Sequence, residues 1–384
     1  MLKKLKDECY IVMGQSPSSV NYNQDKTGTP FMQGRKTFGD KYPTIDTWTT
    51  KLTKIAPKGS ILMSVRAPVG DVNIAPCDLC IGRGLASIKM KNGNNQYLYY
   101  LLKNNSELLR NRSTGTVFEA INKEDLENVV LDFHDEKDQR KISTILSNID
   151  KKILLNEQIS INLHELLKTL YYNSFVLNKN GSWKVDKLGN YLYVDRGLSY
   201  KGQFLSEHGV PMINLGNIMP NGIFRVEKNK YYLGEYKEKV LTKVGDIVLA
   251  NTDMTQNREV IGSPVIVPPI YDGDIIFSHH IYCLRNLKLP KMYIFYTLLT
   301  EQWNAESGGN ATGTTVLALP KETIENYKIV VPDKESLVSF DKLSSPIQKK
   351  REQLMLENLK LEQLRDMLLP KLMIGEIDLN NIEI

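Results

Sequence analysis

The sequence is short of cysteine and of long apolar runs. It has four cysteines in 384 residues, and no run approaches the roughly 18 apolar residues that a membrane-spanning helix needs. The first residues include lysines but lack the apolar segment that is typical of a secretory signal. We therefore expect a cytoplasmic protein with free thiols, because a reducing compartment keeps scattered cysteines unpaired.

Charge of one sign is not in large excess either. The chain has 49 Lys and Arg against 44 Asp and Glu, a formal net charge of +5, which permits a polyanionic partner without requiring one. The hydrophobic content of 41% and the charged content of 24% exclude a wholly disordered chain. At about 100–200 residues per domain, the length indicates two or three domains.

The sequence does not predict a metal site. Cys77 and Cys80 have the spacing of one half of a zinc site, but a structural zinc ion needs four ligands. Cys9 and Cys283 are isolated, and no histidine pair has a suitable spacing. Because Cys80 lies in an apolar stretch, buried thiols are the better interpretation.

Catalytic motifs are missing as well. The segment Gly82-Arg-Gly84 resembles the start of a dinucleotide-binding loop but lacks the third glycine. There is no phosphate-binding loop of the kind used by motors and helicases. Residues 267–270 read Val-Pro-Pro-Ile and contain the two prolines of an amino-methyltransferase motif. Val and Ile replace the polar residue before the prolines and the aromatic residue after them. We therefore predict no catalytic residues.

What the sequence does contain is an internal repeat. Residues 113–120 read STGTVFEA and residues 311–318 read ATGTTVLA. The shift of 198 positions continues without a gap to Asp135, which aligns with Asp333. Further upstream the shift is no longer constant, as loop insertions would cause, and the segment 28–33 aligns with 209–214. The chain is thus two copies of one unit of about 180–200 residues.

Each copy has two parts, which gives an α+β fold class. The first part, residues 1–135 and 179–333, has short apolar runs between turn signals, and it predicts a largely β domain. We expect strands at 60–65, 246–250 and 275–278, and helices at 96–109 and 290–303. The second part, residues 136–178 and 334–384, predicts a long helix in each copy, with a tail after the second one.

The two long helical stretches follow an apolar heptad, which favours pairing between them. In the first, the a positions are Ile142, Ile149, Asn156, Leu163 and Leu170, and the apolar d positions are Ile145, Ile159 and Leu166. The second has Phe340, Ile347, Leu354, Leu361 and Leu368 at a, with Leu343 and Leu364 at d.

Two features of this heptad need an account. Lys152 and Lys350 occupy matched d positions, where we expect their stems to lie along the seam. We expect the regular coil to begin or kink at Pro346. The alternative is that each helix packs only on its own domain.

Polar and basic residues gather in the loops of both copies. Arg can read guanine, Asn and Gln can read adenine, and Gly/Thr loops suit phosphates. The candidate DNA-binding residues of the first copy are Gln33, Arg35, Lys36, Arg66, Arg83, Arg112, Thr114, Gly115 and Thr116. Those of the second copy are Asn214, Asn217, Asn251, Asn257, Arg258, His279, His280, Thr312, Gly313 and Thr314. The alternative is that these are ordinary solvated loops.

Taken together, these features resemble the specificity subunits of type I restriction–modification enzymes. The resemblance rests on the paired variable domains, the Gly-x-Pro segments at 28–33 and 209–214, the Thr-Gly-Thr loops, the repeated helices and the ending at 369–377. It covers essentially the whole chain.

The resemblance implies a non-catalytic subunit that binds double-stranded DNA. Each variable domain, a target recognition domain, would read one half of a split target, and the helices would form an antiparallel coiled coil between the halves. Partners would be two modification (methyltransferase) subunits, which carry S-adenosylmethionine and methylate adenine, and restriction (motor–nuclease) subunits. This chain itself would bind no cofactor.

Two alternatives stay open: a stand-alone or fused adenine methyltransferase or restriction enzyme, and a coiled-coil scaffold without a DNA role. A helix over 138–173 would be on the order of 50 Å long at 1.5 Å per residue. At 3.4 Å per base pair this corresponds to roughly 15 base pairs. The target should therefore be two short blocks separated by an unread gap.

The loops of the two copies diverge more than the helices do, so the halves should read different sequences. We predict that Arg66→Ala and Arg83→Ala relax readout in the first half only. A paired contact to guanine is worth about 1–3 kcal/mol at one base position. The measurement is binding to duplexes with each base of the target varied in turn. An unchanged preference at every position would identify both arginines as structural or phosphate-bound.

Overall fold

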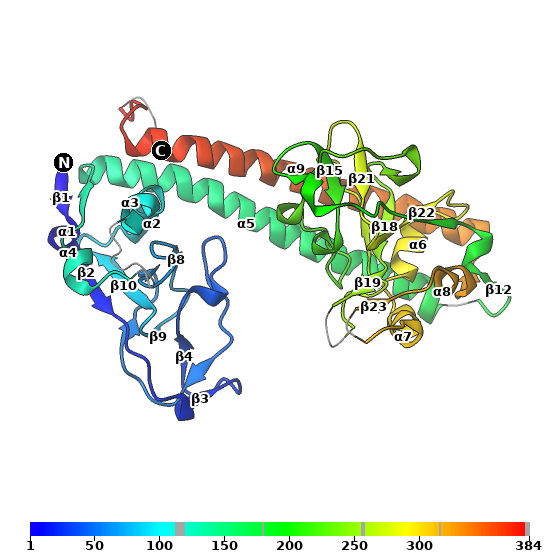
Figure 1. Ribbon diagram of the computed structural model, residues 1–384, viewed down its shortest axis with the longest axis horizontal. Helices are drawn as coiled ribbons and strands as arrows, with labels where there is room; N and C mark the ends of the chain where they lie inside the picture. The colour runs from blue at the N-terminus through cyan, green and yellow to red at the C-terminus, as the bar shows by residue number, and fades with distance from the viewer. Residues whose placement is uncertain (112–119, 179, 255–257, 315, 381–384) are drawn as a thin grey trace. The chain divides into compact units, whose positions relative to one another are not determined.

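The computed structural model describes residues 1–111, 120–178, 180–254, 258–314 and 316–380 (Figure 1). The chain forms two compact units. Unit 1 comprises Met1–Ile153 and Lys360–Ile384, and unit 2 comprises Leu154–Leu359. Within the described ranges, no helix is both long and apolar enough to cross a membrane.

The β part of unit 1 consists of two sheets and a short strand pair. One sheet is antiparallel, in the order β2 (Cys9–Met13), β10 (Leu85–Met90), β7 (Ile61–Ser64) and β8 (Val72–Ile74). The other has the order β3 (Tyr22–Asn23), β5 (Trp48–Thr49), β4 (Thr29–Met32), β9 (Leu79–Ile81) and β6 (Ile55–Ala56), with β4 and β9 parallel. β1 (Leu2–Lys4) pairs with β11 (Val130–Asp132).

Unit 2 repeats the order of both sheets and of the strand pair and has one additional strand pair, which confirms the internal repeat. Its four-stranded sheet is β13 (Tyr193–Arg196), β22 (Ile281–Arg285), β18 (Ile247–Ala250) and β20 (Pro264–Ile266). Its five-stranded sheet is β14 (Leu205–Ser206), β16 (Lys230–Tyr232), β15 (Val210–Ile213), β21 (Ile275–Phe277) and β17 (Leu241–Thr242), with β15 and β21 parallel. β12 (Lys184–Lys187) pairs with β24 (Lys328–Val331), and β19 (Thr252–Asp253) with β23 (Leu317–Ala318).

The three expected strands are present as β7, β18 and β21, but each expected short helix is divided in two. The first is α2 (Asn95–Asn104) and α3 (Ser106–Asn111), and the second is α6 (Lys291–Thr297) and α7 (Glu301–Asn310). The cause is local capping: the Asn105 side chain donates to the Leu101 carbonyl at 2.8 Å, and the Thr300 hydroxyl accepts the Trp303 N–H at 3.2 Å.

The remaining short helices are single turns. They are α1 (Leu5–Glu8), α4 (Lys123–Glu127) and α8 (Lys321–Asn326). The 3-10 turns are η1 (Ser19–Asn21), η2 (Arg35–Thr37), η4 (Leu188–Asn190), η5 (Gly202–Phe204), η6 (Leu215–Asn217), η7 (Val226–Lys228) and η8 (Glu238–Val240).

Two long helices follow the β parts: α5 (Glu136–Tyr172), which ends in a π turn (η3, Asn173–Leu177), and α9 (Lys334–Met373). Both begin with the same cap. Asp135 accepts the backbone N–H of Asp138 at 2.8 Å, and the repeat-equivalent Asp333 accepts that of Ser336 at 2.8 Å. A carboxylate in this position satisfies an orphan N–H and favours the positive end of the helix dipole.

The helices run antiparallel within each unit. In unit 1, Lys141 donates to the Leu379 carbonyl at 2.6 Å, while Asp150, further along α5, pairs with the earlier Arg365 of α9 at 3.2 Å. In unit 2, the fully buried Asn156 donates to Glu357 and Asn358, both at 2.9 Å. Further on, Tyr171 and Phe175 pack on Phe340. The expected antiparallel pairing is thus present.

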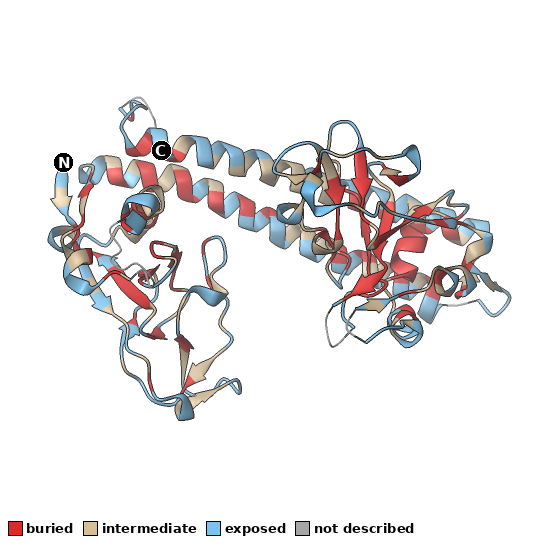
Figure 2. Cartoon of the chain, in the orientation of Figure 1, coloured by how far each residue is buried: buried red, intermediate tan, exposed pale blue. Residues whose placement is uncertain are grey.

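The phase of the buried seam differs from the predicted heptad. Ile142, Ile153 and His164 are all buried, and their 11-residue spacing is that of a nearly straight helix (Figure 2). This shifts the d side of the seam by one residue: Leu166 is 45% exposed, whereas Leu167 is fully buried. The prediction of inward d residues is therefore wrong for Leu166, Leu343 and Leu364, which are exposed. Lys152 and Lys350 also face solvent instead of lying along the seam.

The other heptad residues fall on or beside the seam. Ile142, Asn156, Phe340 and Leu354 are buried, and Ile145, Ile149, Ile159, Leu163, Leu170, Ile347, Leu361 and Leu368 are half-buried. Each helix also packs on the core of the unit that it crosses. Ile142 and Leu146 of α5 and Leu372 of α9 belong to the core of unit 1.

The long helix does not begin at Pro346, and a kink or the start of the regular coil at this residue stays a prediction. α9 begins at Lys334, twelve residues earlier, and continues through Pro346. Leu337 and Phe340 are buried in the core of unit 2 and fix the first turns of the helix. Pro346 itself is exposed, so the backbone bond that it lacks falls on the solvent side.

A buried histidine in unit 2 predicts an acid-sensitive fold. His164 accepts the Tyr296 hydroxyl at Nδ1 (3.2 Å) and donates from Nε2 to the Asn221 carbonyl (2.8 Å). Burial, helped by the nearby Arg351 charge, lowers the pKa of His164 to about 4. Between about pH 6.5 and 4 the unfolded chain binds a proton that the folded chain does not, so stability falls as the pH drops.

The loss should reach about 3 kcal/mol near pH 4. We expect His164→Gln to flatten this part of the pH profile, as measured by urea unfolding at pH 7.5 and pH 4.5. A variant with the same acid sensitivity as the natural chain would contradict the assignment.

Candidate nucleic-acid interface

In unit 1, the loops that follow β2, β4 and β9 meet at one place. Ser16 donates its hydroxyl to Gln33 Oε1 at 2.9 Å and accepts the backbone N–H of Arg83 at 3.1 Å. The backbone N–H of Gly84 donates to the Gln33 carbonyl at 3.1 Å. Gln33 and Arg83 are both exposed, so the structure brings these two predicted residues together on the surface.

The glycines beside Arg83 have a packing role. A Cβ at Gly82 would lie 2.8 Å from the Gln33 Cα, and one at Gly84 would lie 2.7 Å from the Gln33 carbonyl oxygen. Only glycine allows this close approach of two backbones. The segment that resembles a dinucleotide loop is therefore a tight junction that presents the Arg83 side chain.

Arg66 lies next to this junction. Val65 donates its N–H to the Gly84 carbonyl at 3.0 Å, and Arg66 forms a β-bridge with Ala120, the last residue of the repeated stretch 113–120. Arg66 is exposed. The predicted residues Arg112, Thr114, Gly115 and Thr116 lie outside the described residues.

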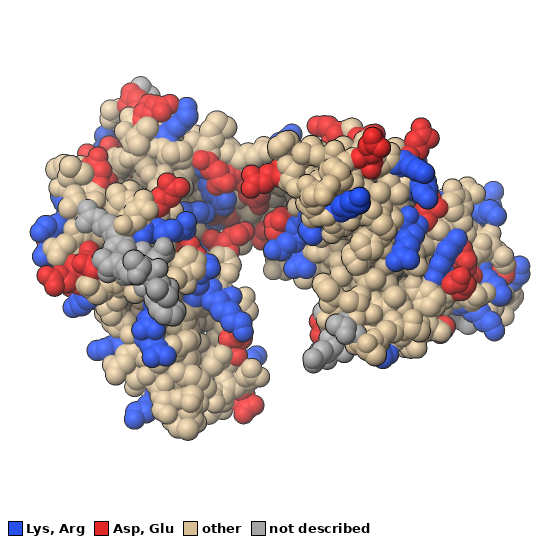
Figure 3. All heavy atoms as spheres, in the orientation of Figure 1, with Lys and Arg blue, Asp and Glu red and all other residues tan. Residues whose placement is uncertain are grey.

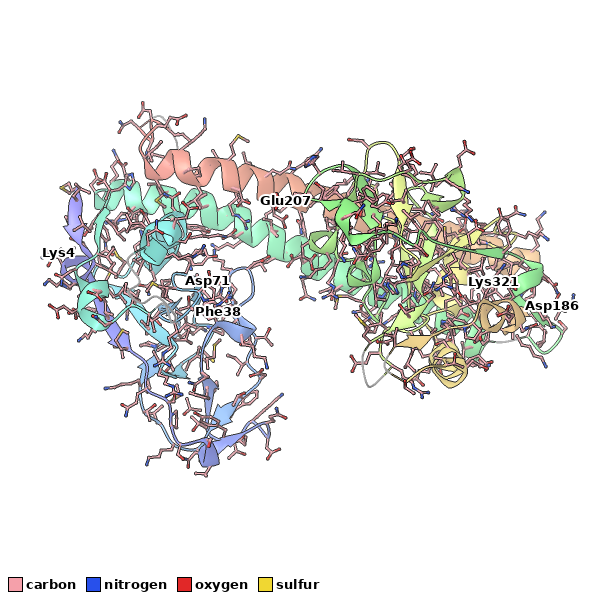
Figure 4. The ribbon with its side chains drawn as sticks, viewed as in Figure 1. Lys4, Phe38, Asp71, Asp186, Glu207 and Lys321 are labelled. Atoms are coloured by element: carbon pink, nitrogen blue, oxygen red, sulfur yellow. The ribbon has the colours of Figure 1, made fainter. Side chains whose placement is uncertain are left out.

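Arg35 and Lys36 lie on η2, directly after Gln33, and both are exposed. Arg35 pairs with Asp71, whose other carboxylate oxygen lies 3.9 Å from Arg110. Asp71 comes from the turn between β7 and β8 and is labelled in Figure 4. Such exposed pairs contribute little to stability, but they hold two guanidinium groups near the junction.

The same segments meet in unit 2, with other side chains. Position after matched strands gives the counterparts. Arg83 and His279 are the middle residues of matched three-residue loops. Arg66 and Thr252 are the second residues after β7 and β18, and Gln33 and Asn214 are the first residues after β4 and β15. Thr252 pairs with Ala318 just as Arg66 pairs with Ala120.

The Thr-Gly-Thr loop of unit 2 is exposed at Thr312, Gly313 and Thr314. Gly313 has a φ of +124°, and a Cβ there would lie 2.2 Å from the Val316 carbonyl oxygen. The loop therefore needs glycine at this position. The backbone N–H and carbonyl of Thr312 pair with Ala318 at 2.9 and 2.8 Å, so the hydroxyls of the exposed Thr312 and Thr314 are the groups that suit phosphate contacts.

The two histidines of unit 2 form a close pair, with ring centroids 3.8 Å apart and the ring planes tilted by 40°. His280 Nδ1 is 2.9 Å from the Thr252 hydroxyl, and the His279 carbonyl accepts from Asn251 at 2.9 Å and from Arg196 at 3.2 Å. The Tyr200 ring lies 5.8 Å from that of His279, and the Lys230 ammonium lies over the Tyr200 ring at 6.0 Å from its centroid.

Several predicted residues instead hold the protein's own backbone. Asn214 is 7% exposed and Asn217 is fully buried; together they form a reciprocal cap on η6. Asn251 is buried and bonded to the His279 carbonyl, and Arg258, although exposed, donates to the Gly308 carbonyl at 2.7 Å. A direct base contact is therefore not supported for Asn214, Asn217 or Asn251. Asn257 lies outside the described residues.

Sequence reasoning did not select Ser16, Arg196, Tyr200 and Lys230 as site residues. The signal for Ser16 was present, because Gly14 and Ser16 align with Gly197 and Ser199 in the repeat. Arg196, Tyr200 and Lys230 carry no such signal, since they have no matched residue of the same type. Basic side chains are interspersed with acidic ones on the visible face of each unit (Figure 3).

The cysteines are free thiols without a site around them. Cys9, Cys80 and Cys283 are buried, as expected, but Cys77 is only half-buried. Burial raises the pKa of the Cys9 and Cys283 thiols to about 12, which makes both unreactive. Among the described residues, no three His, Cys, Asp or Glu side chains are placed to share a metal ion.

Comparison with known proteins identifies relatives along the whole chain. The family described as type I restriction modification DNA specificity domain matches residues 1–165 and 180–362. The specificity subunit of the type I restriction enzyme MjaIX of Methanocaldococcus jannaschii is 25% identical over 98% of this chain and 93% of its own length.

Two further similarities bear on the local sequence and on the fold. A relative named for the specificity subunit of the MjaX enzyme of the same organism is 44% identical, but over 37% of this chain and 34% of its own length. The crystal structure of an S subunit of a type I restriction–modification system from M. genitalium has a TM-score of 0.59 at 16% identity. It covers 97% of this chain and 95% of that one.

Proposed function

The chain belongs to the family of type I restriction modification DNA specificity domains, and we propose that it is the DNA-reading subunit of a type I restriction–modification enzyme. It binds a bipartite, asymmetric target in double-stranded DNA and directs adenine methylation and restriction by partner subunits. The observation that carries the proposal is the junction that occurs twice. The same loops meet in each unit, but their side chains differ. Thr252 and His279 of unit 2 occupy the positions that Arg66 and Arg83 occupy in unit 1.

The pattern of identity within the junction supports this assignment. Ser16 and Ser199, Ala120 and Ala318, and the Thr-Gly-Thr segments are shared by the copies, as contacts to the uniform DNA backbone require. The positions that differ carry the side chains that discriminate between base edges. Two such junctions read two different half-sites.

The chain acts without catalysis and without a cofactor of its own. Modification subunits, one for each repeat, supply S-adenosylmethionine and the methyltransferase site, and restriction subunits supply the motor and nuclease. The absence of methyltransferase and phosphate-loop motifs in the sequence supports this division of labour. The free thiols agree with the cytoplasm, where we place the protein.

The outward leucines of the long helices offer a place for the modification subunits. Leu166, Leu343 and Leu364 lie on the solvent side although they continue the apolar heptad. An exposed apolar side chain on a helix is a place where a partner can bind. A partner helix over α5 in unit 2 would bury Leu166.

This docking surface predicts opposite outcomes for neighbouring leucines. Leu166→Asp should leave folding intact and weaken binding of the modification subunits about tenfold or more, since it puts a charge into the contact. Leu167→Asp should unfold unit 2, because a buried charge without a partner costs more than about 3 kcal/mol. Co-purification with tagged modification subunit and thermal unfolding measure the two effects. Normal assembly of the Leu166 variant would place the partner elsewhere.

The proposed function is tested with the full chain assembled with its modification subunits. We expect methylome sequencing of a host that expresses the complex to give two different short blocks separated by a gap. Filter binding to duplex DNA should weaken steeply as salt rises, because basic residues displace counterions from phosphates. A palindromic or continuous target would overturn the bipartite assignment.

The two other functions have their own tests. A stand-alone methyltransferase would bind radiolabelled S-adenosylmethionine without partners, whereas this chain should not. A scaffold without a DNA role would show no salt-dependent binding to duplex DNA at all.

A further inference from the structure

Unit 2 contains a small cavity that DNA reading does not use. It is lined by residues of α5, α6 and α9, among them Ser160, Phe295, Gln348, Arg351 and Glu352. Its volume is about 40 Å³, roughly three times the 10–15 Å³ that one water molecule requires. Ser160 and Glu352 are only half-buried, so the cavity is open to solvent. A group of about three heavy atoms fits it.

Arg351 brings a charge to this cavity that the protein does not neutralise. Its Nη1 donates to the Gln348 side-chain oxygen at 2.9 Å, but its Nε is buried without a hydrogen-bond partner. Within the described part of the chain it forms no ion pair, and the adjacent Glu352 accepts from Gln348 at 3.0 Å instead. Burial lowers the pKa of Arg351, and the opposing effects of Tyr296 and Glu352 do not offset it. A half-buried cation without a counter-charge is costly.

Unit 1 has an internal ion pair at the matched positions. Asp150 lies 198 residues before Gln348 in the repeat, and Lys41 and Gly222 are the ninth residues after the matched strands β4 and β15. Lys41 Nζ donates to Asp150 at 2.6 Å, and both side chains are buried. In unit 2 a neutral amide replaces the carboxylate and a glycine replaces the lysine, yet a cation, Arg351, is present. What unit 2 lacks at this place is the negative charge.

We propose that this cavity binds a carboxylate group, which pairs with Arg351 as the Asp150 carboxylate pairs with Lys41 in unit 1. The Nε and Nη2 of a guanidinium point in the same direction and match the two oxygens of a carboxylate. The hydroxyl of Ser160, which also lines the cavity, is a further donor. Phe295 and Ile266 give it apolar walls, against which the carbon next to the carboxylate packs.

Two sources supply this chemistry. One is a free small carboxylate, and the other is an Asp or Glu side chain of a modification subunit. The second source rests on the proposed function, whereas the cavity and its uncompensated arginine do not. The probe for both is acetate, which has a carboxylate and one methyl group.

The experiment measures thermal unfolding of the full chain at pH 7.5 while sodium acetate replaces sodium chloride at constant ionic strength. We expect the midpoint temperature to rise by roughly 3–5 °C when acetate is tenfold above its dissociation constant. Arg351→Met should remove this rise. Lys350→Met, which removes an exposed cation next to Arg351 in sequence, should keep it.

A second variant supplies the missing charge from within the chain. Gln348→Glu places a carboxylate where Arg351 Nη1 already finds an oxygen. We expect a higher midpoint temperature in chloride and no further rise with acetate. This gain is informative even if Arg351→Met fails to fold. An equal acetate response in the natural chain and in Gln348→Glu would overturn the proposal.

The remaining carboxylate of the cavity tests where acetate binds. Glu352→Gln removes a negative charge that lines the same space, so acetate should act at a several-fold lower concentration, because like charges repel. An unchanged concentration would mean that acetate binds outside the cavity, and the proposal would then fall.

Assembly with the modification subunits separates the two sources. An acetate response that disappears in the complex identifies a side chain of the partner as the natural occupant, and a response that persists identifies a free carboxylate. Loss of sequence-selective DNA binding by the complex would overturn the proposed function and leave the acetate response of the full chain as it is.

Discussion

Asp150→Ala is expected to destabilise unit 1 by roughly 3–5 kcal/mol, the range for breaking a buried ion pair by removing one partner. Asp150 of α5 is buried and accepts from Lys41 Nζ at 2.6 Å, from Arg365 Nη1 of α9 at 3.2 Å and from the Tyr100 hydroxyl. One carboxylate thus connects both long helices to α2 and to the loop that contains Lys41.

Electrostatics explain the size of the effect. Burial alone would raise the pKa of Asp150, but Lys41, Tyr100 and Arg365 outweigh burial, and the pKa is lowered. Lys41 is itself buried against the Tyr99 and Tyr100 rings. Removal of the carboxylate leaves an ammonium group without a counter-charge in an apolar place, which is the costly half of the change.

The repeat supplies a matched control. Gln348 of α9 lies 198 positions after Asp150 and is nearly buried. Within the part of the chain that the structure describes, its side chain bonds to Arg351 and Glu352 of its own helix. Gln348→Ala removes neutral hydrogen bonds and should cost about 1 kcal/mol. Urea unfolding followed by fluorescence measures both variants.

A second substitution tests the cause. If the unpaired ammonium carries the cost, adding Lys41→Met to Asp150→Ala should recover part of the lost stability. Equal losses for the Asp150 and Gln348 variants would instead mean that the carboxylate contributes only ordinary hydrogen bonds.

The repeat is the part of the fold that the sequence predicts best. Residues that build turns and caps recur at fixed shifts, as Asp135 and Asp333 do, and the two capping bonds have the same length. Strand positions such as β7 and β18 follow, because short apolar runs between turn residues have few other solutions.

The seam of the helices is harder to predict because apolar residues lie on both sides of it. Leu166 and Leu167 are adjacent and chemically identical, yet only Leu167 faces inward. A heptad and an 11-residue repeat differ by a small rotation per turn, which the tertiary packing decides. The network around Asp150 is also invisible in sequence, since Lys41 and Arg365 lie far apart along the chain.

For the interface, sequence reasoning selects loops that the structure brings together, but it does not separate exposed side chains from side chains that bond to their own backbone. Asn214 and Arg83 both follow a strand of the five-stranded sheets. The short asparagine side chain reaches its own backbone and is buried, whereas the long arginine side chain extends into solvent. The sequence alone does not show whether a polar loop residue bonds to its own backbone or extends into solvent.

Lengthening both long helices is expected to change the target itself. α5 passes without interruption from unit 1 into unit 2 at Ile153, and α9 passes back at Leu359. Four helix-forming residues inserted after each of these positions add about 6 Å and a net rotation of roughly 40°, at 100° per residue. Because α9 is antiparallel to α5, the matched insertion keeps the two helices in register.

The number of base pairs between the half-sites must match this change mainly in rotation about the DNA axis. One additional base pair turns the second half-site by about 35°, given about 10–10.5 base pairs per turn, and adds 3.4 Å. A recognition unit must face its groove, whereas a small axial error can be absorbed by tilting. We therefore expect the methylome of the insertion variant to show the same two half-sequences with a gap longer by one base pair, or two at most.

The control changes composition at the same place without changing length. Leu154 and Leu155 are exposed, so replacing both with alanine should leave the gap as it is. If the insertion variant methylates the original spacing as efficiently as before, the helices do not set the distance between the half-sites. The insertion variant could also remain folded and methylate neither the original nor the lengthened spacing. In that case the assembled enzyme tolerates no rotation between the two units, and the partner subunits fix the gap instead.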